Sequence, residues 1–342
     1  MKIRGVWRLK KTWAEVTQHG IILMYHRVAN LSRDPWQINV TPNHFNEHMQ
    51  VLKKYGRPVQ VSKVGKHLKR FSFGKKKIVV TFDDGYADNF HNAKPILERH
   101  EIPATFFIVS GAIDSRIEFW WDELDRIIFD ANAETFERDI ADIKFSKRLI
   151  EQAQKKVMNH DKNENGIPGN SQTLTKSQIF YYALWELMGA LSVHEKPIVL
   201  QELIEWTRQA SKPRPTYLPM TSQEFMSLAQ CPLFEIGAHT VHHPMLTNLS
   251  GKEQEEEISR SKRDLENMIG KPITSFSYPH GKYSDETLQI VKRLKFEAAC
   301  TVVARAVLRS DHQHLLPRFS VLDWNGDQFA ENLQKWLTVK VR

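Results

Sequence analysis

The sequence predicts an α/β fold, a barrel or an open sheet, whose parallel strands are covered on both faces. Two observations support this prediction. Several short runs are apolar at every position, which is typical of strands buried on both sides. Each run is bounded by turn residues and followed by a helical pattern, and this alternation indicates βα units. The predicted strands are residues 20–28, 77–82, 102–110, 232–239, 273–279, 297–303 and 315–322.

Between these strands, the helix boundaries are marked by capping residues. The amphipathic segment ending in NAKPILERH follows the second strand. Thr221 begins a further helix, with Glu224 three residues later in a capping-box pattern. The long segment EQEEEISRSKRDLENMIGKP has acidic residues early and basic residues late, and Gly270 and Pro272 end it.

Residues 115–219 differ from the rest of the chain because they are mostly helical in pattern and contain no strand run. We interpret them as a helical insertion between the third and fourth strands, with HDKNENGIPGNSQ as an exposed loop. The insertion would cap the active site, dock a partner or enlarge the fold. It would belong to one catalytic domain, residues 20–342, preceded by a basic segment at residues 1–19.

The composition of the 342-residue chain is that of an ordinary globular protein, with 41% hydrophobic and 26% charged residues. Its two cysteines, Cys231 and Cys300, form neither a disulfide framework nor a zinc knuckle. A bound metal must therefore use histidine and carboxylate ligands. Despite the net charge of +8, no nucleic-acid-binding signature is found, so nucleic acid is not an expected partner.

The localisation predicted from the sequence is cytoplasmic. There is no signal-peptide pattern and no apolar run of the about 18 residues that a membrane span needs. The basic segment at residues 1–19 interleaves tryptophan and leucine with lysine and arginine. It is either a solvated tail or a peripheral contact with the inner face of an anionic membrane.

Polar clusters follow three of the predicted strands: the pair Asp83 and Asp84, the segment GAHTVHHPML, and the segment FSYPHG. The carboxyl ends of parallel strands meet at one edge of a sheet, where ligands bind. Two adjacent aspartates at the end of a buried strand repel each other, and a bound cation would offset that cost. One carboxylate can hold the cation while the other takes a proton from water.

The second cluster contains His239 and His243, four residues apart and followed by Pro244. Because Pro244 disfavours helical backbone at the preceding residue, we expect a turn at the strand end. His242 lies between the pair and could compete as a ligand. Together with a strand-end carboxylate, the pair is typical of a His₂-carboxylate metal site with open coordination positions.

At this point the sequence resembles a known family. TFDDGY followed by HTVHHP is similar to the two signature motifs of the polysaccharide deacetylase family, carbohydrate esterase family four. The resemblance covers residues 20–111 and 219–322. It implies a deformed (β/α) barrel and metal-dependent removal of acetyl groups from N-acetylated sugars.

Carried over by position, the resemblance makes Asp83 the general base. It makes Asp84, His239 and His243 ligands, usually of Zn²⁺, with Co²⁺ or Ni²⁺ in some members. Thr240 would steady the turn between the two histidines.

The third motif departs from the family pattern. Where the family often has Arg-x-Pro-Tyr, this chain has Ser277, Tyr278, Pro279 and His280. The arginine that orients the base is therefore missing, and our hypothesis is that Arg318, on the last predicted strand, replaces it. The backbone N–H of His280 would help to bind the oxyanion.

The family's late Leu-x-His motif, which carries the general acid, is not found here. The candidates for the acid are His26 at the end of the first strand, His280, and the pair His312 and His314. We also expect substrate contacts from Thr240, Tyr278, Pro279 and Tyr86. Other aromatic residues that can stack on sugars or pack in the core are Trp120, Trp121 and Tyr283.

The function predicted from these features is removal of acetyl groups from N-acetylated sugars of a polysaccharide, oligosaccharide or lipid-linked precursor. Such a step would belong to envelope or exopolysaccharide synthesis. One alternative is an O-acetyl esterase, which uses the same groups. The other is a non-catalytic glycan-binding protein, since the usual arginine and acid are missing.

Overall fold

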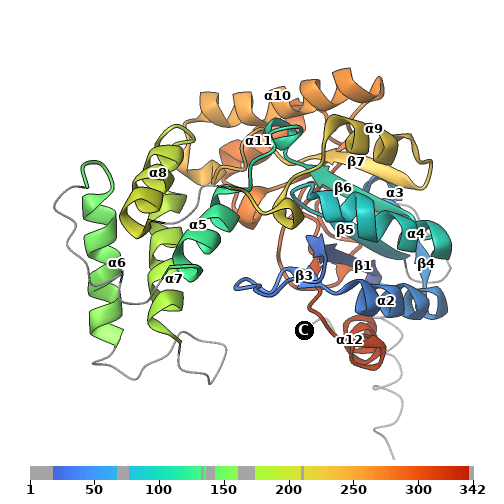
Figure 1. The fold of residues 1–342 in the computed structure, drawn as a ribbon. Coiled ribbons are helices and arrows are strands. Elements are labelled where there is room, and N and C mark those ends of the chain that lie inside the picture. The colour runs from blue at the N-terminus through green and yellow to red at the C-terminus, as the bar shows by residue number, and fades with distance from the viewer. Residues whose placement is uncertain are drawn as a thin grey trace, which may run out of the picture. The chain divides into compact units, whose positions relative to one another are not determined.

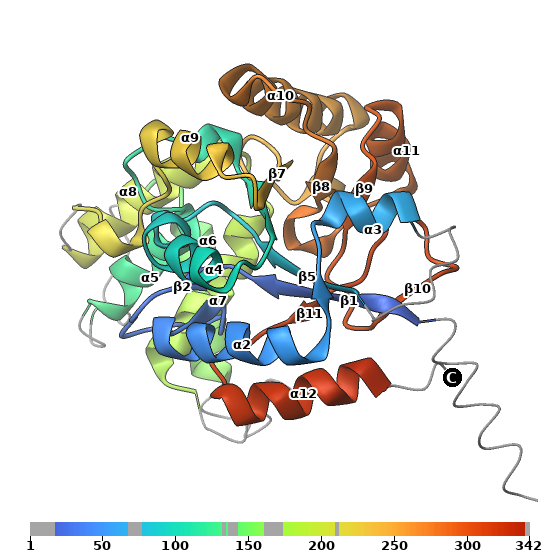
Figure 2. The ribbon, with the colours of Figure 1, turned by 90° about the vertical axis from the view of Figure 1, so that its right-hand side faces the viewer.

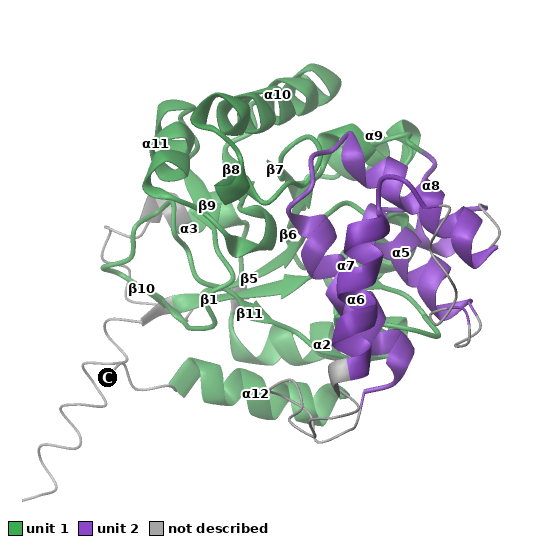
Figure 3. Ribbon diagram, turned by 90° about the vertical axis from the view of Figure 1, so that its left-hand side faces the viewer, with its two compact units in different colours: residues 1–115, 219–342 green, residues 116–218 purple. Residues whose placement is uncertain are grey.

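A computed structural model of the chain describes residues 18–67, 77–131, 135, 143–160, 174–208 and 212–338. The basic segment at residues 1–19 lies outside the described part except for its last two residues, and so does nearly all of the loop predicted at 160–172. The chain divides into two compact units, Met1–Ser115 with Pro219–Arg342 and Arg116–Leu218 (Figure 3).

The first unit is built on one large sheet (Figures 1 and 2). Its strand order is β10 (Val307–Leu308), β1 (Gln18–Tyr25), β5 (Lys77–Phe82), β6 (Ala104–Ile108), β7 (Phe234–Ala238), β8 (Ser275–Ser277) and β9 (Ala298–Cys300). Every neighbouring pair from β1 to β9 is parallel, and β10 is antiparallel to β1. The predicted α/β fold with a parallel sheet is therefore confirmed, with β10 as an exception.

Short strands complete the unit. β4 (Arg57–Pro58) pairs with β5, and β11 (Phe319–Ser320) pairs with β1. β2 (Arg27–Val28) and β3 (Asn39–Val40) form a separate ribbon. The predicted strand at 315–322 is thus present only as the two residues of β11.

Helices cover the outer face of the sheet. Core residues from these helices and from the sheet form one hydrophobic cluster. The helices are α2 (Pro42–Tyr55), α4 (Lys94–His100), α9 (Ser222–Gln230), α10 (Gly251–Ile269), α11 (Asp285–Arg293) and α12 (Gly326–Thr338). The predicted caps are confirmed: Glu224 N–H donates to Thr221 Oγ1, and α10 ends at Gly270, whose φ of 65° suits glycine.

The inner face of the sheet encloses a second cluster, which explains why the strands are apolar throughout. Ile22 of β1, Val79 of β5 and Ala298 of β9 belong to it, together with Val61 and Val64 of α3 (Val61–His67). Strands from distant positions in the sheet can share one cluster only if the sheet curls around it. The first unit is therefore a curled, partial barrel (Figure 2).

The segment before β11 bridges the two sides of this curl. Leu316 pairs with Cys300 at the end of β9, and Phe319 pairs with Leu23 of β1. Arg318 lies between these two contacts and is fully buried. The side chain of Arg318 is thus held inside the barrel by its closing segment.

The second unit contains only helices as regular structure among its described residues. Its main helices are α5 (Trp120–Phe129), α6 (Lys147–His160), α7 (Lys176–Gly189) and α8 (Glu195–Thr207). They form a hydrophobic core of their own. Arg214 closes the unit by pairing with Glu118 and Asp125, both of which are buried. We propose that this unit is an insertion into the catalytic domain.

No helix in the described part of the chain is long and apolar enough to cross a membrane.

Candidate metal centre

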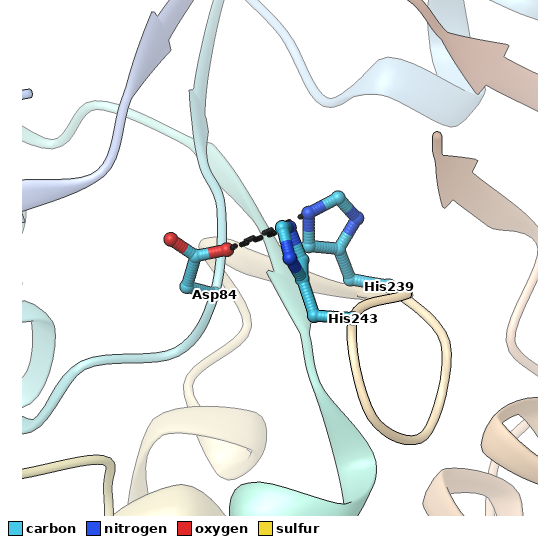
Figure 4. A group of neighbouring side chains, drawn as sticks. All are labelled: Asp84, His239 and His243. Carbon is cyan, nitrogen blue, oxygen red and sulfur yellow. Dashed lines mark ion pairs between the residues drawn. The ribbon is translucent and has the colours of Figure 1, made fainter. Parts of the chain in front are cut away.

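Three predicted ligands meet at the carboxyl edge of the sheet (Figure 4). Asp84 follows β5, and His239 and His243 follow β7. Oδ1 of Asp84 lies 3.6 Å from Nε2 of His239 and 3.4 Å from Nε2 of His243. All three residues are buried, and one ligand atom of each lies within 4.8 Å of the others.

The protonation of His239 shows that this cluster fits a cation. Nδ1 of His239 lies 2.8 Å from the carbonyl oxygen of Ser277, which can only accept, so Nδ1 carries the proton. Burial lowers the pKa of His239, although Asp83 opposes that effect, and the ring is neutral. The Nε2 lone pair therefore faces the carboxylates of Asp83 and Asp84. Facing lone pairs repel each other, and a cation between them would remove that repulsion.

The chemistry of the donor set agrees with this fit. Two imidazole nitrogens and one carboxylate oxygen are ligands suited to zinc, and they leave a coordination position for water or substrate. The Ser277 carbonyl fixes the ring of His239 in the way that outer groups usually orient histidine ligands.

The turn between the two histidines has an uncommon backbone. It is not helical, as predicted from Pro244. Thr240 has φ of 64° and His243 has φ of 56°, both in the left-handed region that β-branched residues in particular avoid. Thr240 Oγ1 donates to His239 O at 2.6 Å and accepts from His243 N–H at 3.0 Å. Left-handed residues of this kind cluster at functional sites.

Asp83 faces Arg318 beside the cluster. Arg318 Nη1 and Nη2 donate to the two carboxylate oxygens of Asp83, each at 2.7 Å. The pair is completely buried on the arginine side and almost so on the aspartate side. Burial alone would raise the pKa of Asp83, but the guanidinium of Arg318 outweighs it and holds that pKa well below its usual range. Asp83 is therefore ionised at neutral pH.

Three residues around this pair were not predicted to act. Ser277 Oγ donates to Asp83 Oδ2 at 3.2 Å and accepts from Arg318 Nη2 at 2.9 Å. Thr81 Oγ1 and the carbonyl of Thr301 accept the remaining Arg318 donors. Ser277 stands where the family often has its arginine, and a small residue there leaves room for a guanidinium from another strand. In the sequence, this serine in place of the family's arginine was the signal that pointed to Arg318.

His26 lies next to Asp83 because the backbone N–H of Asp83 donates to the carbonyl of Tyr25. Burial lowers the pKa of His26 to about 4, and the charge of Asp83 only partly opposes this. Side chains from the segment after β5 hold the backbone around His26 in place. Asn89 Nδ2 donates to the His26 carbonyl at 2.8 Å, and Asp88 accepts from Val28 N–H at 2.9 Å.

His280 approaches the cluster from the other predicted motif. Its ring centroid lies 4.6 Å from that of His243, and its φ is 55°. It occupies the middle of the short turn Pro279–Gly281, which follows β8. In contrast, Nε2 of His314 lies 2.6 Å from the carbonyl oxygen of Phe296, and its ring lies 5.2 Å from that of His312 at a tilt of 48°.

The four side chains expected to contact the substrate are all buried. Tyr86 is fully buried, with the guanidinium of Arg27 4.3 Å from its ring centroid, so this ring face is not open to a sugar. The hydroxyl of Tyr278 donates to the His314 carbonyl in the core. Pro279 is also buried, and Thr240 supports the turn. Buried aromatic rings and sugar-stacking rings have the same residue types, so sequence alone does not separate them.

Comparison with known proteins agrees with this fold. The sequence matches the family model described as polysaccharide deacetylase over residues 71–156 and 206–299. YxkH of Bacillus subtilis is 21% identical over 304 residues, 88% of this chain and 70% of that protein. A poly-β-1,6-N-acetyl-D-glucosamine N-deacetylase of Staphylococcus aureus is 28% identical over 107 residues, which cover 28% of this chain and 37% of that one.

Among solved structures, the deacetylase PplD of Streptococcus pyogenes, in complex with acetate, has a TM-score of 0.56 with this chain. The sequences are 18% identical, and the match covers 94% of this chain and 99% of PplD. The curled, partial barrel of the first unit is the fold of these deacetylase structures. The family model matches more than half of the sequence, and the chain belongs to the polysaccharide deacetylase family.

Proposed function

We propose that the protein is a metal-dependent hydrolase that removes acetyl groups from N-acetylated sugars. The observation that carries the proposal is the convergence of Asp84, His239 and His243, with the ionised Asp83 next to them. Family membership and the N-deacetylase activity named for the Staphylococcus aureus relative support the substrate class.

Asp84, His239 and His243 would hold the metal. A bound Zn²⁺, or Co²⁺ or Ni²⁺ in its place, would polarise the acetyl carbonyl and lower the pKa of a water molecule. The His239 ring is oriented for this role by the Ser277 carbonyl.

Asp83 would accept the proton of the attacking water. Its low pKa makes it a weak base, but Arg318 keeps it ionised and fixes both of its oxygens. The backbone N–H of His280 would donate to the oxygen of the tetrahedral intermediate.

A proton must finally reach the departing amine. We propose His26 as its donor, since His26 lies next to Asp83 at the end of β1. Its pKa of about 4 means that it is neutral at rest, so it must gain a proton during the reaction before it donates one.

The test is acetate release from β-1,6- and β-1,4-linked N-acetylglucosamine oligomers, with loss of the acetyl group followed by mass spectrometry. We expect release by the zinc-loaded protein, none after chelation, and recovery when zinc is added back. Asp83→Asn is the matched control, because it keeps the size of the side chain but cannot take up a proton. Acetate release that survives both chelation and Asp83→Asn would contradict the proposal. Release from O-acetylated glycans alone would favour the esterase alternative.

A second assay separates His26 from His280 as the general acid. p-Nitrophenyl acetate has a good leaving group that needs no protonation, whereas an amide needs it. His26→Gln should therefore reduce amide hydrolysis by about 100-fold or more and ester hydrolysis far less. If His280→Gln shows this pattern and His26→Gln does not, the acid is His280.

A further inference from the structure

The turn that carries both histidine ligands, residues 239–243, rests on a carboxylate from a different helix. We propose that Glu257 of α10 is a positioning residue that holds this turn in its ligand-binding shape. The inference rests on the proposed metal site.

Glu257 binds the turn through both of its carboxylate oxygens. Oε2 accepts from the consecutive backbone N–H groups of Val241 and His242, each at 3.0 Å. Oε1 lies 2.6 Å from Nδ1 of the His242 ring. Adjacent N–H groups that point to one side form a cradle for an anion, and here that anion is a largely buried glutamate, 13% exposed.

The turn needs such an anchor because of its backbone. Thr240 and His243 are held in the left-handed region, which is strained for residues other than glycine. From the other side, the N–H groups of Ser110 and Gly111 donate to the carbonyls of Thr240 and Val241 at 3.1 and 3.0 Å. Backbone donors on one side of the turn and the Glu257 carboxylate on the other thus fix the peptide groups between His239 and His243.

Removing the carboxylate would leave two neighbouring N–H groups without their acceptor, and the turn would relax toward ordinary backbone angles. The two Nε2 atoms would then no longer converge on Asp84. Loss of a group that supports a metal ligand typically costs 10- to 100-fold in metal affinity. We therefore expect His242 to contribute to the site through its backbone N–H, and we expect loss of its ring, 41% exposed, to leave zinc binding unchanged.

The experiment measures the zinc dissociation constant by competition with a chromophoric chelator, together with thermal unfolding of the metal-free proteins. We expect Glu257→Ala to weaken zinc binding by about 10- to 100-fold. Glu256→Ala is the matched control, because this neighbouring glutamate is 63% exposed on the same helix. It should bind zinc like the wild type, and so should His242→Ala, which keeps both backbone donors.

Each outcome is decisive. Wild-type affinity in Glu257→Ala overturns the positioning role while leaving the metal site intact, whereas absence of zinc binding in the wild type refutes the metal site itself. A loss of affinity in His242→Ala equal to that in Glu257→Ala also overturns the proposal, because the ring would then be responsible. If Glu257→Ala does not fold, Glu257→Gln decides. It keeps one acceptor oxygen without the charge and should weaken binding about three- to tenfold, and unchanged affinity would overturn the role.

Discussion

Replacing Arg318 tests the role assigned to it beside Asp83. Its guanidinium makes five hydrogen bonds inside the barrel, two of them to Asp83 at 2.7 Å. In Arg318→Ala, Asp83 stays buried and keeps only the hydroxyl of Ser277 as a donor among these contacts. Breaking a buried ion pair on one side costs about 3–5 kcal/mol of unfolding free energy. This is a large share of the roughly 5–15 kcal/mol that stabilises a typical domain.

The partly exposed pair of Arg305 with Asp311, whose side chain is 8% exposed, supplies the matched control. Both of its hydrogen bonds measure 2.8 Å, but Arg305 is 42% exposed. Arg305→Ala should therefore cost about 1 kcal/mol or less and leave turnover unchanged. Arg318→Lys, which keeps the charge without the paired geometry, should fall between the two alanine variants.

The assay combines urea unfolding of metal-free protein with acetate release by zinc-loaded protein. Without Arg318, burial should raise the pKa of Asp83 above its unfolded value. The stability deficit should then shrink as the pH falls from this raised pKa toward the unfolded value of about 3.9, because protonation removes the uncompensated charge. Turnover at neutral pH should fall by about 100-fold or more. If Arg318→Ala matched Arg305→Ala in both stability and turnover, the reasoning would be refuted.

Three further predictions concern the surroundings of the site and the core. His48 is buried between Tyr25 and the Trp324 carbonyl, and burial lowers its pKa to about 4. The unfolded chain takes up a proton at His48 near pH 6.5, whereas the folded chain does so only near pH 4. His48 alone should therefore lower the free energy of unfolding by about 3 kcal/mol as the pH falls from about 6.5 to about 4. In urea titrations, His48→Gln should reduce the pH dependence of the unfolding free energy by the uptake of one proton. An unchanged pH dependence would contradict the assignment. Ser277→Ala should lower the free energy of unfolding by about 1–2 kcal/mol and should lower kcat less than Arg318→Ala does. An equal loss of kcat in the two variants would count against this ranking. Gly111→Ala would bring a Cβ within 2.6 Å of the carbonyl oxygen of Val241, in the turn between the two histidine ligands. Zinc affinity should therefore fall by about tenfold. Wild-type affinity would show that the turn can shift without loss of the site.

Much of the fold could be predicted because its signals are local. The strand Lys77–Phe82 was predicted with the bounds it has, since apolar residues on both faces mark a buried strand. The ends of α9 and α10 depend on capping residues within one helical turn. The two-residue strand β10 was not predicted, because so short a pairing leaves no periodic pattern.

The site could be predicted where its residues lie directly after strands. Asp84, His239 and His243 are brought together because parallel strands share one edge. The pairing of Arg318 with Asp83 spans 235 residues, and it depends on how the last segment closes the barrel. The sequence supported it only through the missing arginine at Ser277. Burial of Tyr86 and Tyr278 is a property of the packed fold, and residue type does not reveal it.

The central claim is that one cation is held by Asp84, His239 and His243 with Asp83 beside it. A crystal structure of the zinc-loaded protein, with anomalous difference maps at the zinc edge, tests this most directly. The account predicts one strong peak at about 2.0–2.2 Å from Nε2 of both histidines and from a carboxylate oxygen of Asp84. A fully loaded protein whose zinc peak contacts none of these side chains would contradict it.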